Sequence, residues 1–262
     1  MTIAQPEVLL ERRGGVAIIT LSQPDRRNAF TQEMRESIAE MLGQLANEVA
    51  IRAVVITGAE GNFSAGADVS RVVQFEPGIL PQRERTARVQ QVVRAMRYGP
   101  KPIIAAVEGV AFGGGLAFAA AADVVVAARD ARFSSAFTRI GYMPDMGLIH
   151  NLSERVGRSK ARQLLLLGTV IDAEEAERLG LVDTVVEPGQ ALAEAVRVGE
   201  SFEELAPLAI ACTRRALASD PSTLEETFRL ELEWQPLLGE SEDRQEAMNA
   251  FLEKRKPRFK GR

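Results

Sequence analysis

Two glycine-rich turns are the strongest candidates for a functional site in this sequence. One is the run Gly113-Gly114-Gly115, which follows an apolar stretch and opens a helical one; the other, residues 61–68 (GNFSAGAD), also follows an apolar stretch. Glycine lets backbone approach a ligand closely, and the first N–H groups of a helix have no partner inside the helix. If both turns follow parallel strands, they meet at the carboxyl edge of one sheet. Two converging N–H groups are what an oxyanion hole requires, so the turns predict a joint site of that kind.

Each turn also has a purely structural interpretation. The small residues of the triple glycine suit a close crossing of a helix and a strand, and Asp68 suits the N-cap of a helix. Phosphate binding is not indicated, because the triple glycine lacks a following Gly-Lys-Ser/Thr and has no further glycine three residues beyond Gly115. Neither the P-loop nor the dinucleotide fingerprint is therefore present.

The elements that must position these turns follow from the hydrophobic pattern. Short apolar runs rich in β-branched residues alternate with segments of helical spacing, which predicts an α/β fold with both faces of the sheet covered. The predicted strands are residues 16–21, 53–57, 103–107, 124–128 and 181–186. The predicted helices among them are residues 31–49, 83–97, 115–122, 159–167 and 173–179.

The pattern becomes wholly helical from residue 190 onward. The helices predicted there are residues 190–205, 207–219, 221–237 and 241–256, with Pro207 and Pro221 in first-turn positions. We therefore divide the chain into an α/β core that carries the site (1–189) and a helical C-terminal oligomerisation region (190–262).

Composition excludes several classes of protein. The chain has 262 residues, of which 46% are hydrophobic and 26% charged, the balance of a folded globular protein. Its single cysteine, Cys212, excludes an internal disulfide and a cysteine zinc site, and its single histidine, His150, excludes a histidine-rich metal site. A net charge of −4 gives no general reason to bind nucleic acid or an anionic membrane. No targeting segment or membrane span is recognisable, so we expect a cytoplasmic protein.

Five stretches, in order along the chain, resemble the crotonase (enoyl-CoA hydratase/isomerase) superfamily. They are residues 19–30 (ITLSQPDRRNAF), 54–68 (VVITGAEGNFSAGAD), 101–123 (KPIIAAVEGVAFGGGLAFAAAAD), 173–182 (AEEAERLGLV) and 250–260 (AFLEKRKPRFK), with Gly168 between them. The resemblance covers nearly the whole chain, and it is far more specific for the superfamily than for one reaction. It implies a spiral of ββα units with a helical C-terminal trimerisation region, assembled as a homotrimer or homohexamer.

The resemblance also implies an acyl-CoA site. Ala67 and Gly114 would supply the two N–H groups that hold the thioester carbonyl. The backbone around Arg27 and Ala29, with Ala65, is similar to the family's cradle for the coenzyme A moiety, and we place Asp68 with this set. Coenzyme A would enter as part of the thioester substrate, with no permanently bound cofactor and no metal.

Two departures from the family pattern decide which reaction we expect. The positions of the two glutamates that activate water in family hydratases hold Ala117 and Phe137 here, and neither side chain can transfer a proton. Asp145, in the segment GYMPDMG (141–147), stands where several double-bond isomerases of the family have an aspartate. The alternative for Asp145 is that its side chain caps the following helix.

The resemblance and its departures favour an enoyl-CoA double-bond isomerase, with Asp145 as proton shuttle and Ala67 and Gly114 as oxyanion donors. The first alternative is an enoyl-CoA hydratase or another lyase of the family, using Asp145 or Glu108. The second is a non-catalytic binder of acyl-CoA, or of RNA through the basic tail at 254–262, although the acidic net charge speaks against nucleic acid.

The segment between residues 69 and 99 should line the acyl pocket, but it indicates no particular acyl group. Its arginines are interpreted as a solvated face: Arg71, Arg83, Arg85 and Arg88. His150 is expected to be a packing or surface residue.

Overall fold

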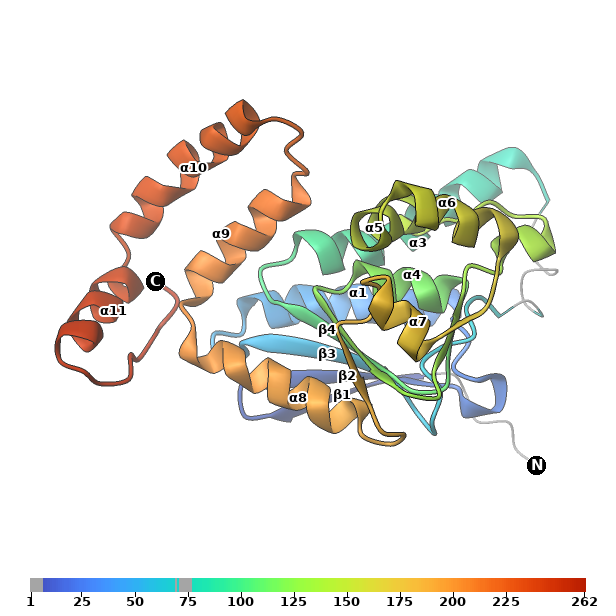
Figure 1. The fold of residues 1–262 in the computed structure, drawn as a ribbon, viewed down its shortest axis with the longest axis horizontal. Helices are drawn as coiled ribbons and strands as arrows, with labels where there is room; N and C mark the ends of the chain where they lie inside the picture. The colour runs from blue at the N-terminus through green and yellow to red at the C-terminus, as the bar shows by residue number, and fades with distance from the viewer. Residues whose placement is uncertain (1–6, 69, 71–76) are drawn as a thin grey trace.

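The computed structural model describes residues 7–68, 70 and 77–262, and a six-stranded sheet runs through it in the order β1-β2-β3-β4-β6-β9 (Figure 1). The strands are β1 (Glu7–Arg13), β2 (Val16–Ser22), β3 (Ala53–Gly58), β4 (Ile103–Val107), β6 (Val124–Ala128) and β9 (Thr184–Val186). β1 is antiparallel to β2, and every other neighbouring pair in this sheet is parallel. The carboxyl ends of β2, β3 and β4 therefore lie at one edge.

A second, three-stranded sheet contains β5 (Val110–Phe112), β7 (Arg132–Ser134) and β8 (Ile171–Asp172). The chain enters it directly from the large sheet twice, passing from β4 to β5 and from β6 to β7. Each of these two consecutive strand pairs thus contributes one strand to each sheet. The strands of the second sheet have two or three residues, too few to show a period of two, and the sequence did not predict them.

Helices cover both faces of the large sheet, and successive residues of β2 show how the core is divided. Ala17 and Ile19 face one cluster of buried apolar side chains, whereas Val16 and Ile18 face another. The helices of the first cluster are α1 (Gln32–Asn47), α3 (Ile79–Tyr98), α4 (Gly114–Ala121), α5 (Leu148–Val156), α6 (Arg158–Leu167) and α7 (Ala173–Arg178). The predicted α/β fold, with its sheet covered on both faces, is confirmed.

Among the described helices, α8 (Ala191–Ser201) covers the other face of the sheet. Gly199 makes this close approach feasible, because a Cβ there would lie 2.9 Å from a methyl carbon of Val16. In packing terms α8 belongs with the sheet, although it follows the boundary predicted at residue 189. That division of the chain stays a prediction.

Three further helices extend away from the sheet: α9 (Pro207–Ala218), α10 (Leu224–Gly239) and α11 (Glu242–Leu252) (Figure 1). Pro207 opens α9 as predicted. Pro221 does not open α10, which begins three residues later behind a capping box formed by Thr223 and Glu226. None of the described helices is both long and apolar enough to cross a membrane.

Candidate active site

The loops that follow β2 and β3 are tied together by Asn28. Its buried side chain accepts the N–H of Gln23 (2.9 Å) and donates to the carbonyls of Ala59 (2.8 Å) and Asn62 (2.6 Å). The Ser64 hydroxyl donates to the Asn28 carbonyl (2.7 Å) and accepts the Gly66 N–H (3.1 Å). These buried bonds fix the turn at residues 61–68 against the first loop. Sequence reasoning missed this role, because a single Asn or Ser in a turn gives no sign of its distant partners.

The N–H groups of Ala67 and Gly114 are both available at the turns. Phe30 donates to the carbonyl of Gly66 (2.6 Å) and accepts from Asp68 (3.1 Å), so the Ala67 N–H between them is left out of this pairing. Gly114 is the first residue of α4, where an N–H has no partner inside the helix. Neither N–H donates to any residue in the described part of the chain. Both residues line one cavity of about 350 Å³.

Close backbone approach explains the neighbouring glycines. A Cβ on Gly66, whose φ is +94°, would lie 2.7 Å from the Phe112 carbonyl oxygen, and a Cβ on Gly115 would lie 2.3 Å from that of Ser64. The structural interpretation of the triple glycine as a tight crossing therefore holds at Gly115. It coexists with the open N–H of Gly114.

Asp145 lines the same cavity, and its side chain does not cap the following helix. Gly147 is the N-cap of α5, with no side-chain hydrogen bond, so the capping alternative is wrong. Met146 and Gly147 both have left-handed backbone (φ +54° and +71°), and this turn brings the Leu148 N–H to the Asp145 carbonyl (3.0 Å). Burial raises the pKa of the Asp145 carboxyl, and the charges of Arg35 and Arg85 oppose that rise.

The two positions expected to hold hydratase glutamates have different surroundings. Ala117 is fully buried within α4, and Phe137 lines the cavity beside Asp145. Apolar side chains form much of the remaining wall: Phe30, Val89, Ile140 and Met146. This wall accommodates an acyl chain or ring.

The predicted coenzyme A set lies on the two loops joined by Asn28. The Ala65 N–H donates to the Arg27 carbonyl (2.9 Å), Arg27 is exposed, and Ala29 is buried. Asp68 lines the cavity, where its carboxylate accepts from Arg26 (3.2 Å) and from the Ser70 hydroxyl (2.6 Å). The structure thus brings all four residues to one region, and their contact with coenzyme A stays a prediction.

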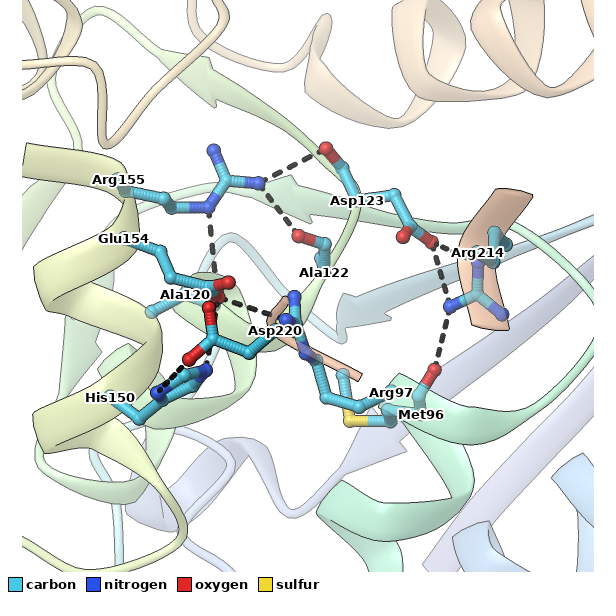
Figure 2. A network of polar contacts seen from close by, with 10 residues as sticks. All are labelled: Met96, Arg97, Ala120, Ala122, Asp123, His150, Glu154, Arg155, Arg214 and Asp220. Atoms are coloured by element: carbon cyan, nitrogen blue, oxygen red, sulfur yellow. Dashed lines mark hydrogen bonds and ion pairs between the residues drawn. The ribbon is translucent and has the colours of Figure 1, made fainter. Parts of the chain in front are cut away.

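Glu108 has a structural partner outside the cavity. Its carboxylate accepts the N–H groups of Gly189 (3.1 Å) and Ala191 (2.9 Å) at the start of α8, and Glu108 is absent from the cavity wall. This position contradicts its use as an alternative base. His150 is half-exposed and lies 3.5 Å from Glu154 and 4.0 Å from Asp220 (Figure 2).

Three charged cavity residues were missed as site residues by the sequence analysis: Glu33, Arg35 and Arg85. The interpretation of Arg85 as part of a solvated face is wrong, whereas Arg83 and Arg88 are exposed and Arg71 lies outside the described residues. A signal was present, because each inward arginine continues the apolar stripe of its helix. Arg35 precedes Ile38, Leu42 and Leu45 at helical spacing, and Arg85 precedes Val89, Val92 and Met96 in the same way.

Helix α4 is anchored at the end remote from the cavity (Figure 2). Arg155 donates to the carbonyls of Ala120 (3.3 Å) and Ala122 (2.6 Å), which places a cation at the negative end of the helix dipole. Asp123 follows α4 and accepts from the Ile103 N–H (2.7 Å) and from Arg214 (2.9 Å). These contacts fix the position of the helix whose first N–H faces the cavity.

Comparisons with known proteins all indicate the same enzyme family. A family model described as enoyl-CoA hydratase/isomerase matches residues 11–262. A 1,2-epoxyphenylacetyl-CoA isomerase from Escherichia coli is 35% identical over 95% of this chain and 96% of its own length. A short-chain-enoyl-CoA hydratase from Clostridium acetobutylicum is 34% identical, with 95% of each chain covered. The crystal structure of an enoyl-CoA hydratase from Polaromonas superimposes with a TM-score of 0.91 at 33% identity, covering 97% of this chain and 99% of the other.

Proposed function

This chain belongs to the enoyl-CoA hydratase/isomerase family, and we propose that within it the protein is an acyl-CoA double-bond isomerase. The close structural likeness also confirms the predicted crotonase-like fold. The observation that carries the proposal is the content of one cavity. It holds the carboxylate of Asp145 and the open N–H groups of Ala67 and Gly114, while the two hydratase positions are Ala117 and Phe137.

The proposed reaction needs one base and two hydrogen-bond donors. The thioester carbonyl accepts from Ala67 and Gly114, and Asp145 removes a proton from the acyl chain. The electron pair of the broken C–H bond delocalises into the thioester as an enolate, whose oxygen the two N–H groups stabilise. Asp145 then returns the proton to a different carbon, which moves the double bond and consumes no water. One carboxylate is sufficient for such a shuttle.

The environment of Asp145 supports this role. Burial raises its pKa, so the ionised carboxylate accepts a proton more readily than an exposed aspartate does. Arg35 and Arg85 oppose that rise and favour the ionised form that a base requires. The coenzyme A moiety is proposed to lie outside the cavity, along the loops that carry Arg27, Ala29 and Ala65.

Hydration is a second candidate, because two further carboxylates line the cavity, those of Glu33 and Asp68. Glu33, in the first turn of α1, shares the wall with Asp145. Water addition in this family's manner uses two acid/base groups, and this pair provides two carboxylates. Asp68 also lines the cavity, and its carboxylate accepts from Arg26 and from the Ser70 hydroxyl.

A screen of enoyl-CoA thioesters in D₂O separates these reactions. Mass spectrometry and NMR follow deuterium uptake, the position of the double bond and any hydroxyacyl product. Isomerase activity gives exchange and a displaced double bond without hydration, and Asp145→Asn abolishes both while Glu33→Gln retains them. Hydration that requires both Asp145 and Glu33 selects the second candidate.

Asp130→Asn is a matched control for the aspartate substitution. Asp130 is exposed in the turn after β6, so its variant should behave as wild type. Tight acyl-CoA binding without exchange or hydration on any thioester overturns the enzymatic proposal and favours a non-catalytic binder.

A further inference from the structure

Arg35 is a buried cation on the wall of the cavity, and its side chain has a single hydrogen-bond acceptor among the described residues. Its residue is 7% exposed, and its Nε is inaccessible and has no hydrogen-bond partner. One Nη donates to the Gln32 side chain at 3.3 Å, and no described carboxylate lies within ion-pair distance of the guanidinium. A guanidinium has five N–H donors, so most of its hydrogen-bonding capacity is unused.

Arg214 shows how the same chain satisfies a buried arginine (Figure 2). It is also 7% exposed, yet it donates to the carboxylate of Asp123 (2.9 Å), the carbonyl of Met96 (2.7 Å) and the carbonyl of Gly99. Because an unpaired buried charge is strongly destabilising, a structural arginine acquires such partners. Arg35 differs in lining a cavity that is open to a ligand. Because the Nε is inaccessible, we expect the acceptor from the cavity to meet the Nη groups of Arg35.

The position of Arg35 relative to Asp145 indicates which part of a ligand it meets. Burial raises the pKa of Asp145 and lowers that of Arg35, and the charge of each group opposes the shift of the other. The two charged groups thus interact electrostatically, and no ion pair joins them among the described residues. Arg35 and Asp145 line the same cavity, so an acyl segment that reaches Asp145 shares that cavity with Arg35, and Arg85 adds positive charge to its wall.

We propose that Arg35 selects substrates whose acyl group carries an oxygen, either a carboxylate or a neutral carbonyl, ether or hydroxyl, which accepts a hydrogen bond from its guanidinium. This inference rests on the proposed function in one respect, that the cavity receives the acyl part of a coenzyme A thioester. The rest of the acyl group is expected to be apolar, because Phe30, Val89 and Met146 line the same cavity.

Binding of unreactive thioesters tests the proposal without turnover. Saturated acyl-CoA thioesters of equal length that end in a methyl, a hydroxyl or a carboxylate are titrated calorimetrically into wild type and Arg35→Met. The best oxygen-bearing thioester should bind wild type about tenfold or more tighter than the methyl-ended one, the scale of a hydrogen bond to a charged group. In Arg35→Met, which keeps a flexible stem without the cation, that advantage should fall to about twofold or less.

Controls and competing outcomes are defined by the same titrations. Arg88→Met removes an exposed arginine of α3 and should retain the full preference. A preference for the carboxylate identifies an anionic acyl group, and equal preference for the hydroxyl identifies a neutral one. Wild type that binds the methyl-ended thioester as tightly as the others, or that binds no thioester, overturns the proposal. This comparison of ligands needs no variant, so misfolding of Arg35→Met does not prevent the test.

The failure of this proposal is distinguishable from the failure of the isomerase proposal. An Arg35-dependent preference in binding, together with no bond migration in D₂O, refutes the reaction and leaves the specificity intact. Isomerisation with no preference for an acyl oxygen refutes the specificity and leaves the proposed reaction intact. Arg35→Lys adds a graded readout, because it keeps the charge and loses the planar fork, so it should retain more affinity for the carboxylate than Arg35→Met does.

Discussion

At the scale of single residues, the cavity combines a carboxylate whose burial raises its pKa with two arginines whose charges oppose that rise. Burial of Asp145 favours its neutral form, whereas Arg35 and Arg85 favour its ionised form, and burial is the larger effect. The proton affinity of the base therefore depends on side chains from α1 and α3. Substitution of Arg35 or Arg85 should therefore change the pH dependence of the rate, while the reaction that is catalysed stays the same.

The acid limb of the rate profile should report the ionisation of Asp145. In wild type, kcat/KM should decline on acidification with an apparent pKa above 3.8, the ordinary value for aspartate, because a base must be ionised to act. Arg35→Met removes an opposing cation and should move this limb to higher pH, whereas Arg35→Lys should leave it nearer to that of wild type. Rates of deuterium exchange across the acid and neutral range measure the limb. An unchanged limb in Arg35→Met would show that Arg35 does not influence the base.

Stability should have a matching dependence on pH. Because the pKa of Asp145 is higher in the folded chain than in the unfolded one, the folded state binds more protons between the two values. This contribution to stability is present below the unfolded pKa and is lost as pH rises through the folded pKa. Asp145→Asn removes that loss, so at neutral pH it should be at least as stable as wild type. Thermal unfolding at acid and neutral pH checks this, and a clear destabilisation at neutral pH would indicate a structural carboxylate.

The donor at Gly114 is tested by a pair of substitutions. Proline is tolerated in the first turn of a helix but has no N–H, so Gly114→Pro should reduce turnover by about 10² or more. Gly114→Ala keeps the N–H while adding a Cβ 3.3 Å from the Met146 sulfur and 3.4 Å from the Phe30 ring, and it should lose much less. Turnover is compared at retained circular dichroism and oligomer size. Equal activity of folded Gly114→Pro and Gly114→Ala would exclude this donor.

At the scale of elements, the N-termini of α4 and α8 have different roles. The first residue of α4, Gly114, lines the cavity, and Arg155 donates to a carbonyl at the other end of that helix. The N-terminus of α8 is closed by the carboxylate of Glu108, which accepts two backbone N–H groups there. One terminus is thus available to a ligand and the other is satisfied internally.

Glu108→Gln should separate these roles. The amide keeps the shape of the side chain but loses the charge and one acceptor, so unfolding free energy should fall by about 1 kcal/mol, the scale of a lost helix cap. Exchange activity should stay within about twofold of wild type, because Glu108 is not on the cavity wall. Denaturant unfolding and D₂O exchange measure the two quantities. A 10²-fold loss of activity at unchanged stability would instead make Glu108 a catalytic residue.

Elements with long apolar runs could be predicted from the sequence, and shorter ones could not. The runs in β2, β3, β4 and β6 are buried on both faces, so their pattern is continuous and unambiguous. β1 is largely exposed and carries Glu11, Arg12 and Arg13, so it has no comparable pattern. The glycine turns could be found because their chemistry lies in the backbone. The cations at Arg35 and Arg85 were missed although each continues the apolar stripe of its helix, because a charged residue in an amphipathic helix is ordinarily at its surface.

At the scale of the whole molecule, the C-terminal helices extend from the core with much of their apolar surface uncovered. Helix α10 has no buried residue, and large apolar side chains on it are exposed, among them Leu224, Phe228, Leu232 and Leu237. Arg214 anchors α9 to the core, so this arm has a defined starting point (Figure 2). Uncovered apolar surface on such a scale is typical of an interface.

We propose that this surface lies between copies of the chain in a homotrimer or homohexamer, and light scattering at micromolar concentration tests it. Wild type should have a native mass well above the 28.5 kDa of one chain. Phe228→Glu with Leu232→Glu places two carboxylates on the exposed apolar face of α10, which should lower the native mass because a desolvated, unpaired charge opposes association. Val49→Glu, at an apolar position 62% exposed beyond the end of α1, is the matched control and should leave the mass unchanged. A wild-type mass of 28.5 kDa contradicts the assembly; a doubly substituted α10 that stays fully assembled places the interface elsewhere.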